Sequence, residues 1–276
     1  MNHRKNKPDR IIPTISVSIV LYKTEIPVIL KCIKALLASF NHIEKKGQVG
    51  GRIDKILLVD NSADHKLPES IDRTKIRYIK TEKNLGYGGG HNIALAAARS
   101  DLHLFLNPDA FLDKEFLANA CQIFDELQDV ALVGARGIDQ CGKELSLAKR
   151  YPKLFNLVLR GLDIRTLNDI FFKRLEKYKF GDKLACKIFE AEHLSGCCLF
   201  GRTELIKRIG GFDESFFLYF EDFDLCRRLS KLGKIVSAKN CRVTHLGGHT
   251  ARKGPRHIYF FFRSAIIFFK RYGWSF

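Results

Sequence analysis

The sequence lacks several features that would assign a chain to a class at once. Its eight cysteines include no C-x-x-C pair, so no zinc-ribbon or thioredoxin-like motif is present. No apolar run reaches the ~20 residues of a membrane-spanning helix, and the first apolar stretch has no small-residue cleavage site. Internal repeats and low-complexity tracts are also missing. We therefore expect a reduced cytoplasmic protein with buried thiols and no signal peptide.

Acidic residues are few relative to basic ones. The 276 residues include 47 Lys plus Arg and 30 Asp plus Glu, so the formal net charge is 47 − 30 = +17. This excess predicts an anionic partner, which could be nucleic acid, an acidic membrane surface or a phosphorylated substrate. Apolar residues make up 46% of the chain, which excludes intrinsic disorder and suits one large domain or two small ones.

Strand-like and helix-like patterns alternate through the first half of the chain. The β-branched run at residues 16–22 is typical of a strand buried on both faces, and residues 26–40 follow with helical spacing. Further strands are predicted at 55–62, 102–107, 130–135 and 193–202, and further helices at 92–98, 114–127 and 204–209. This order predicts an α/β fold, with a doubly wound, mostly parallel sheet and helices on both faces.

Polar residues stand where two of these strands end. In such a sheet ligands bind beyond the carboxyl ends of the strands, which here carry Asp60, Asn61, Asn107 and Asp109. A carboxylate at Asp109 can help to hold a divalent cation, because such ions often use one or two carboxylates together with substrate phosphates. The alternative is an ordinary Asn-Pro-Asp turn.

A glycine-rich segment, NLGYGGGHN, covers residues 84–92 between a predicted strand and a predicted helix. Its backbone N–H groups could approach a phosphate or a ribose closely. It has neither the Lys-Ser/Thr of a P-loop nor the G-x-G-x-x-G spacing. The alternative is a flexible turn in which His91 or Asn92 caps the helix.

Three carboxylates, Glu221, Asp222 and Asp224, begin a helical pattern in FLYFEDFDLCRRL. Acidic residues in a first helical turn are commonly capping groups. The surrounding aromatic side chains could instead raise a carboxylate pKa towards that of a general base. Further along, His245 and His249 flank a glycine pair and Arg252 follows, a set that could complete a metal or diphosphate site or be structural.

In this order, these segments resemble the GT-A glycosyltransferases of family 2, and within them the bacterial rhamnosyltransferase-like group. The resemblance spans residues 15–272 and rests on SVSIVLYKT, LLVDNSAD, KNLGYGGGHNIAL, LFLNPDA, HLSGCCLFGR, IGGFDESFFLYFEDFDLCRRL and THLGGHT. It implies one GT-A domain over residues 1–256, with a donor-nucleotide half at about 14–135 and an acceptor half at about 136–256. An aromatic, basic helix is expected at 257–276.

The resemblance also implies a reaction. It is inverting sugar transfer, with L-rhamnose from dTDP-rhamnose as the first expectation and a UDP- or GDP-sugar as the alternative. The acceptor would be a saccharide or a lipid-diphosphate-linked saccharide in cell-surface polysaccharide synthesis, such as that of O-antigen. The enzyme would use a divalent cation, Mg²⁺ or Mn²⁺, and would lie in the cytoplasm at the inner face of the plasma membrane.

The resemblance assigns roles to residues as well. Asp222 matches the catalytic base of the family, and Asp109 and His245 match its metal ligands, although Asn107 stands where a D-x-D motif would have its first acid. Residues matching the donor site are Asp60, Asn84, Gly86, Asn92, Asn107 and Asp109. Residues expected near the acceptor or the diphosphate are Glu221, His249 and Arg252.

The C-terminal segment and two rival functions complete the expectations. Residues 257–276 either dock the enzyme on an anionic membrane surface or form a helix packed on the domain with Arg263 and Lys270 exposed. A sugar nucleotidyltransferase would carry a Gly-rich, Arg-containing loop after its first strand, where this chain reads YKTEIP. A non-catalytic polyanion-binding protein remains as the remote alternative, but no helix-turn-helix, finger or stacking platform is recognisable, and no nucleic-acid partner is expected.

Overall fold

The computed structural model describes residues 13–46, 52–62, 71–139, 142, 144–153, 156–157, 171–246 and 254–274. The strands are β1 (Thr14–Leu21), β2 (Arg52–Asp60), β3 (Ile76–Lys80), β4 (Leu102–Leu106), β5 (Ala110–Leu112), β6 (Val130–Ile138), β7 (Glu144–Leu145), β8 (Ala148–Lys149), β9 (Ile188–Glu190), β10 (His193–Leu194), β11 (Cys198–Arg202) and β12 (Lys234–His245). The helices are α1 (Ile26–Lys46), α2 (Gly86–Ala97), α3 (Phe116–Glu126), α6 (Phe172–Tyr178), the 3₁₀ turn η1 (Gly181–Lys183), α7 (Thr203–Arg208), α8 (Glu221–Leu229) and α9 (Pro255–Tyr272).

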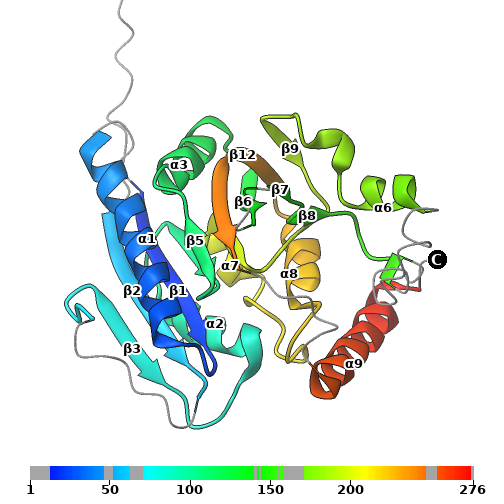
Figure 1. The fold of residues 1–276 in the computed structure, drawn as a ribbon, viewed down its shortest axis with the longest axis horizontal. Helices are drawn as coiled ribbons and strands as arrows, with labels where there is room; N and C mark the ends of the chain where they lie inside the picture. Colours follow the sequence, from blue (N-terminus) through cyan, green and yellow to red (C-terminus); the bar gives the residue numbers. More distant parts are fainter. Residues whose placement is uncertain are drawn as a thin grey trace, which may run out of the picture.

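A ten-stranded sheet forms the centre of the molecule (Figure 1). Its order is β3-β2-β1-β4-β11-β6-β12-β5, with β7 beside β6 and β9 beside β12. Strands β3, β2, β1 and β4 are mutually parallel, and β12 is parallel to β6. Strand β11 runs antiparallel to both of its neighbours, β4 and β6. The predicted α/β class with a mostly parallel sheet is therefore confirmed.

Helices cover both faces of the sheet. Helices α1 and α3 place residues such as Ile29, Leu36 and Phe116 in the main core cluster with the buried side chains of β1 and β4. On the opposite face, α2, α7 and α8 pack through residues such as Leu95 and Leu225. Among the described helices, α1 alone is long and apolar enough to cross a membrane, but its apolar face is packed in this core.

The glycine-rich segment differs from the prediction of a turn followed by a helix at 92–98. The helix α2 already begins at Gly86, so the glycines form its first turns and neither His91 nor Asn92 caps it. They allow close packing: a Cβ on Gly88 would lie 2.7 Å from Phe212, and one on Gly90 would lie 2.8 Å from Val20. The predicted strand at 193–202 is likewise interrupted, because β10 and β11 belong to different sheets.

A buried chain of polar side chains crosses the core between α2 and β4. It links His91 Nδ1 to Ser18 Oγ (2.7 Å), Ser18 Oγ to His103 Nε2 (2.9 Å), and His103 Nδ1 to Ser16 Oγ (2.6 Å). Ser16 in turn contacts Ser100, which donates to the carbonyl of Leu102. Burial lowers the pKa of His103 to about 3 and holds the pKa of His91 well below its ordinary value.

The cysteines of the described residues are all unpaired. Six of them are buried and Cys186 is partly exposed; the buried ones are Cys32, Cys121, Cys197, Cys198, Cys226 and Cys241. Burial raises the pKa of Cys121 and Cys197 to about 12. These side chains therefore pack as small apolar groups, which agrees with the sequence prediction of buried thiols.

Candidate active site

Glu221 and Asp222 begin α8 after two residues with left-handed backbone. Tyr219 and Phe220 have φ values of 69° and 66°, an unfavourable conformation for side chains of this size. This turn buries Glu221, whereas 19% of the Asp222 side chain remains exposed. Strained backbone is retained where the surrounding packing enforces it, often at functional sites, and here it sets the direction of two adjacent carboxylates.

The two carboxylates differ in their preference for a proton. Burial, reinforced by the negative charge of Asp222, raises the pKa of Glu221 well above its ordinary value. Burial also raises the pKa of Asp222, but the charge and hydrogen bond of His193 and the N–H of Gly196 outweigh it and hold that pKa below its ordinary value. The predicted rise of a carboxylate pKa therefore applies to Glu221, whereas the net pKa of Asp222 is lowered. Of the two carboxyl groups, Glu221 keeps its proton to the higher pH.

His193 is the partner of Asp222. Its Nε2 atom lies 3.1 Å from Asp222 Oδ2, and its ring stacks on Phe223 with centroids 3.5 Å apart. The side chain is 1% exposed, so the contact is shielded from water. The sequence reasoning missed this residue; the available signal was a histidine opening the apolar segment HLSGCCLFGR.

The segment Gly196–Cys197 links three parts of the site. The Gly196 N–H donates to Asp222 Oδ2 (2.9 Å), and the carbonyl of Cys197 accepts from the N–H of Asn107 (2.9 Å). The hydroxyl of Tyr87, in the first turn of α2, donates to the carbonyl of Gly196. One short segment therefore contacts the predicted base, the end of β4 and the glycine-rich helix. Tyr87 is a second residue that the sequence reasoning did not single out.

Asp109 and His245 meet at the pairing of β5 with β12. His245 Nε2 lies 3.3 Å from Asp109 Oδ1, and the N–H of Leu246 donates to the Asp109 carbonyl (3.1 Å). Asn107, two positions before Asp109 in the sequence, has a buried Oδ1 that accepts no hydrogen bond from the described residues. The structure thus brings together Asp109 and His245, which lie far apart in the sequence.

These three side chains fit a divalent cation. A carboxylate, an imidazole and an amide oxygen are all suitable ligands, and Mg²⁺ commonly uses few protein ligands together with substrate phosphates. At no place in the part of the chain that the structure describes, this one included, do three His, Cys, Asp or Glu side chains gather. The remaining ligands of such an ion would therefore come from a diphosphate and water.

Asp60 lies fully buried at the end of β2, beside the ends of β1 and β3. Its Oδ1 accepts from the N–H of Ser62 (2.8 Å), and its Oδ2 accepts from the hydroxyl of Tyr78 (2.7 Å). The neighbouring Asn61 donates to the carbonyl of Gly86 (2.9 Å). This corner connects the end of β2 to the start of α2.

The three predicted residues of the glycine-rich segment have clear local roles. Asn84 Oδ1 accepts from the N–H of Gly86 (2.9 Å), which fixes the turn into α2. Gly86 has φ +77°, and a Cβ there would lie 2.2 Å from the carbonyl oxygen of Phe217. The Asn92 amide donates to the carbonyl of Phe212 and accepts from its N–H (2.8 and 2.9 Å). Gly86 and Asn92 therefore hold α2 against residues 212–217.

Asp224 has a structural environment. It is fully buried and receives hydrogen bonds from Arg228 (2.7 Å), Arg271 (2.9 Å) and Tyr272 (2.6 Å). It thereby ties α8 to α9 and does not face the same site as Asp222. His249 and Arg252, expected near the acceptor or the diphosphate, lie outside the described residues.

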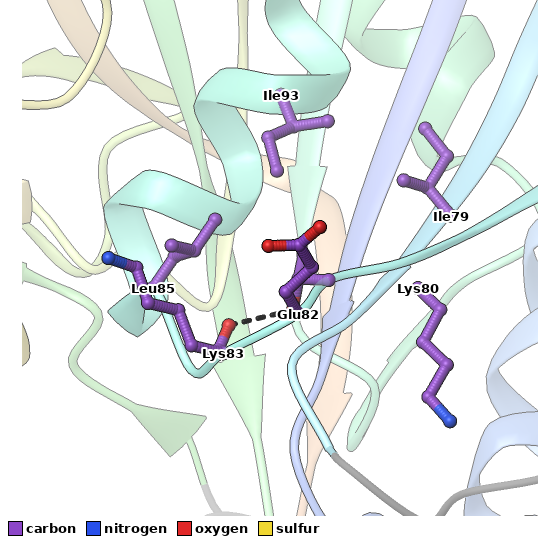
Figure 2. Close-up of a pocket in the computed structure, with 7 residues that line it drawn as sticks. Ile79, Lys80, Glu82, Lys83, Leu85 and Ile93 are labelled. Atoms are coloured by element: carbon purple, nitrogen blue, oxygen red, sulfur yellow. Dashed lines mark hydrogen bonds between the residues drawn. The ribbon is translucent and has the colours of Figure 1, made fainter.

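An open pocket of about 290 Å³ lies at the end of β3, and Figure 2 shows the residues around it. Its lining comes from β3, the following loop and α2: Ile79, Lys80, Thr81, Glu82, Lys83, Leu85 and Ile93. None of the predicted side chains lines it. Thr81 nevertheless connects this pocket to the end of β2, because its hydroxyl contacts the Asp60 carbonyl (3.0 Å) and Asn61 Oδ1 (3.1 Å).

Comparison with known proteins gives a family match and distant relatives. The model of a family described as Glycosyl transferase family 2 matches residues 16–210. The chain is 26% identical over 239 residues to an N-acetylglucosaminyl-diphospho-decaprenol L-rhamnosyltransferase of Mycobacterium tuberculosis, covering 79% of this chain and 76% of that protein. It is 22% identical over 195 residues to the low-salt glycan biosynthesis hexosyltransferase Agl10 of Haloferax volcanii, covering 69% of this chain and 57% of that protein.

Solved structures share the fold at low sequence identity. GalNAc-T7 with UDP, GalNAc and Mn²⁺ superposes with a TM-score of 0.66 at 14% identity, covering 95% of this chain and 48% of that chain. The mannosyltransferase PcManGT from Pyrobaculum calidifontis, in complex with GDP-Man and Mn²⁺, gives 0.57 at 15%, covering 88% and 59%. The chain therefore spans about half to three fifths of the length of these two proteins.

Proposed function

The chain belongs to glycosyl transferase family 2, and on that premise we propose that it transfers L-rhamnose from dTDP-rhamnose with inversion. The proposed acceptor is a saccharide or a lipid-diphosphate-linked saccharide of cell-surface polysaccharide synthesis. One observation carries the proposal. Asp222, the end of β4 at Asn107, and Tyr87 of the glycine-rich helix all contact the segment Gly196–Cys197. The residues proposed as base, cation site and donor loop therefore meet around two consecutive residues.

Asp222 serves as the base on the acceptor side. It is ionised at neutral pH, because its partners hold its pKa below the ordinary value. Inversion by one displacement requires removal of a proton from the acceptor hydroxyl, which the exposed part of Asp222 can accept. Glu221, whose Oε2 is buried and accepts no hydrogen bond from the described residues, is proposed to orient an acceptor hydroxyl.

Asp109 and His245 serve the donor side. An ion of Mg²⁺ or Mn²⁺ held by them, beside Asn107 Oδ1, would neutralise the charge that develops on the departing diphosphate. His249 and Arg252 are proposed as further contacts to the diphosphate or the acceptor. Asp60 is proposed to contact the nucleoside, and Asn84, Gly86 and Asn92 shape the adjoining loop.

The sugar and the location are supported by different observations. The named activity of the M. tuberculosis relative favours rhamnose and a lipid-linked acceptor. The solved neighbours, which were determined with UDP or GDP-Man, favour the alternative of a UDP- or GDP-sugar. Anionic donor and acceptor groups and the net charge of +17 favour a cytoplasmic enzyme at the inner face of the plasma membrane.

A thermal-shift panel tests the proposal. The nucleotides dTDP, UDP and GDP are added with and without Mn²⁺ to the wild type and to Asp109→Ala. A ligand at about 100 times its Kd stabilises the folded state by about 2.7 kcal/mol, which is measurable. A metal-dependent shift that is largest for dTDP and lost in the variant is expected. A shift with UDP or GDP alone would show that the donor is a UDP- or GDP-sugar in place of dTDP-rhamnose. The absence of a shift with every nucleotide would overturn the proposal.

A further inference from the structure

Helix α9 has two different faces. One face packs on the domain: Ser264, Ala265, Phe268 and Phe269 are buried, the last two among the aromatic side chains of residues 216–223. The other face carries large apolar side chains in the open. Tyr259 is 62% exposed, Phe262 is 61% exposed, and Ile258 and Ile266 are each 45% exposed.

The exposed apolar residues form one stripe. Their positions, 258, 259, 262 and 266, follow helical spacing, so the four side chains lie along one side of α9 over a length of about 12 Å. Exposed apolar side chains occur singly on most proteins, but an ordered stripe on one helix marks an interaction surface. We call these four residues the outer stripe.

Positive charge accompanies the outer stripe. The sequence of α9, PRHIYFFFRSAIIFFKRY, has four Arg or Lys and no Asp or Glu. Three of the basic residues, Arg256, Arg263 and Lys270, are exposed and recur every seven positions, so they line up along one edge of the helix. Arg263 donates to the carbonyl of Ser215 (2.8 Å), a contact that leaves its charge without a carboxylate partner.

We propose that the outer stripe of α9 docks on an anionic lipid bilayer, with the stripe inserted at the headgroup boundary and Arg256, Arg263 and Lys270 on lipid phosphates. A helix with an apolar stripe, flanking cations and no acids has the chemistry of an interfacial helix. The inner face of α9 remains packed on the protein. The packed inner face confirms one expectation for the C-terminal segment, and the proposal assigns the other to the outer stripe.

This docking explains how a lipid-linked acceptor would reach Asp222, and in this respect it deepens the proposed function. The inner side of α9 holds the segment that precedes Glu221: Ser264 Oγ donates to the carbonyl of Leu218 (2.8 Å), and Tyr219 Oη lies 2.8 Å from His257 Nδ1. The bilayer surface and the turn before Glu221 are thus separated by about one helix diameter, or 10–12 Å. Figure 1 shows α9 next to α8, on the side away from α1 and β3.

Surface substitutions in the full chain test the docking. A truncation before α9 would expose the phenylalanines beneath it, so we choose exposed positions instead. Phe262→Ser/Ile266→Ser removes half of the outer stripe, and Arg256→Gln/Lys270→Gln removes two cations. Lys34→Gln/Lys45→Gln on α1 is the matched charge control, and Phe172→Ser on α6 is the matched apolar control.

The measurement is co-sedimentation with vesicles of phosphatidylcholine, with and without phosphatidylglycerol. We expect binding to the anionic vesicles only, a loss of at least tenfold in the stripe variant and of about tenfold or more in the cation variant, and little change in either control. Wild type that does not sediment, or a stripe variant that binds like wild type, would overturn the docking. So would a dimer in lipid-free solution that the stripe variant dissociates, because a second copy would then cover the stripe.

The nucleotide shift of each variant separates this inference from the proposed function. The α9 variants are expected to keep the shift of the wild type, since none of their residues lies at the donor site. Vesicle binding without any nucleotide shift would support the docking and overturn the transferase proposal. A nucleotide shift without vesicle binding would support the transferase proposal and overturn the docking.

Discussion

His193 Nε2 lies 3.1 Å from Asp222 Oδ2, inside a contact that stacking on Phe223 closes to water. The carboxylate of Asp222 therefore depends on an imidazole for part of its stabilisation. Gly196 supplies a second stabilising contact through its N–H. The ionisation of the proposed base can be changed through His193 without altering the base itself.

Replacing His193 should move the acidic limb of the pH–rate profile. In the wild type, the imidazole holds the pKa of Asp222 below its ordinary value, so the base stays ionised down to low pH. In His193→Ala the burial of Asp222 acts with less opposition, its pKa rises, and kcat/KM falls at a higher pH than in the wild type. Measurement of kcat/KM against pH checks this. Identical acidic limbs in the two proteins would contradict the role given to His193.

Asp222→Asn should separate binding from transfer. The amide cannot accept the proton of the acceptor hydroxyl, so we expect transfer to fall by about 10²- to 10⁴-fold while the nucleotide shift is kept. Glu221→Gln is the matched control, because the raised pKa of Glu221 favours its protonated form, which an amide of equal size resembles. We expect less than about a tenfold loss there. Transfer at near the wild-type rate in Asp222→Asn would rule out this base.

The buried histidines predict loss of stability in acid. The pKa values of His91 and His103 are lowered in the folded state, so below the ordinary value of about 6.5 the unfolded chain binds protons that the folded chain does not. Their contribution to the free energy of unfolding is therefore fully present above pH 6.5 and decreases as the pH falls, for His103 down to about pH 3. In that range His103 adds a slope of up to about 1.4 kcal/mol per pH unit, and His91 acts in the same direction. Denaturant unfolding of wild type and His103→Gln at a series of pH values should show a shallower slope in the variant; parallel curves would contradict it.

Two glycines with the same backbone conformation separate the cost of left-handed backbone from the cost of a steric clash with a new Cβ atom. Gly86 and Gly210 have φ values of +77° and +79°, but a Cβ meets the Phe217 carbonyl at 2.2 Å in the first case and nothing within 4 Å in the second. Gly210→Ala should cost about 1–2 kcal/mol, from left-handed backbone alone. Gly86→Ala should cost about 1–3 kcal/mol more, because residue 217 must move. Equal losses in denaturant unfolding would show that the contact of Gly86 with Phe217 is relaxed in solution.

The sequence predicted most of the sheet because its signals are local. The β-branched run of β1 and the apolar strands β4 and β6 are recognisable from a few residues each. The start of α2 was missed, because glycine has a low helix propensity and the helix at Gly86 depends on packing against Phe212 and Val20. Phe212 lies 124 positions from Gly88 and Val20 lies 70 positions from Gly90, so no local pattern reveals this packing.

In the candidate site, too, local features could be predicted and long-range contacts could not. Asp60, Asp109 and Asp222 stand out in the sequence because each is a carboxylate next to an apolar segment. The partnership of Asp222 with His193, and the raised pKa of Glu221 in place of Asp222, depend on how β10 and α8 meet. Spacing along the chain carries no information about how β10 packs against α8, so neither the His193 contact nor the raised pKa of Glu221 could be predicted.

Strand β11 has a consequence for how the polypeptide reaches this structure. It is inserted between β4 and β6 in the middle of the sheet, although it follows both of them in the sequence. While the chain is being synthesised, one edge of β4 stays without its native partner until Cys198–Arg202 has emerged, and an unpaired apolar strand edge is prone to aggregation. Such long-range pairing slows folding, so production of this protein should respond to chaperones and to lower temperature.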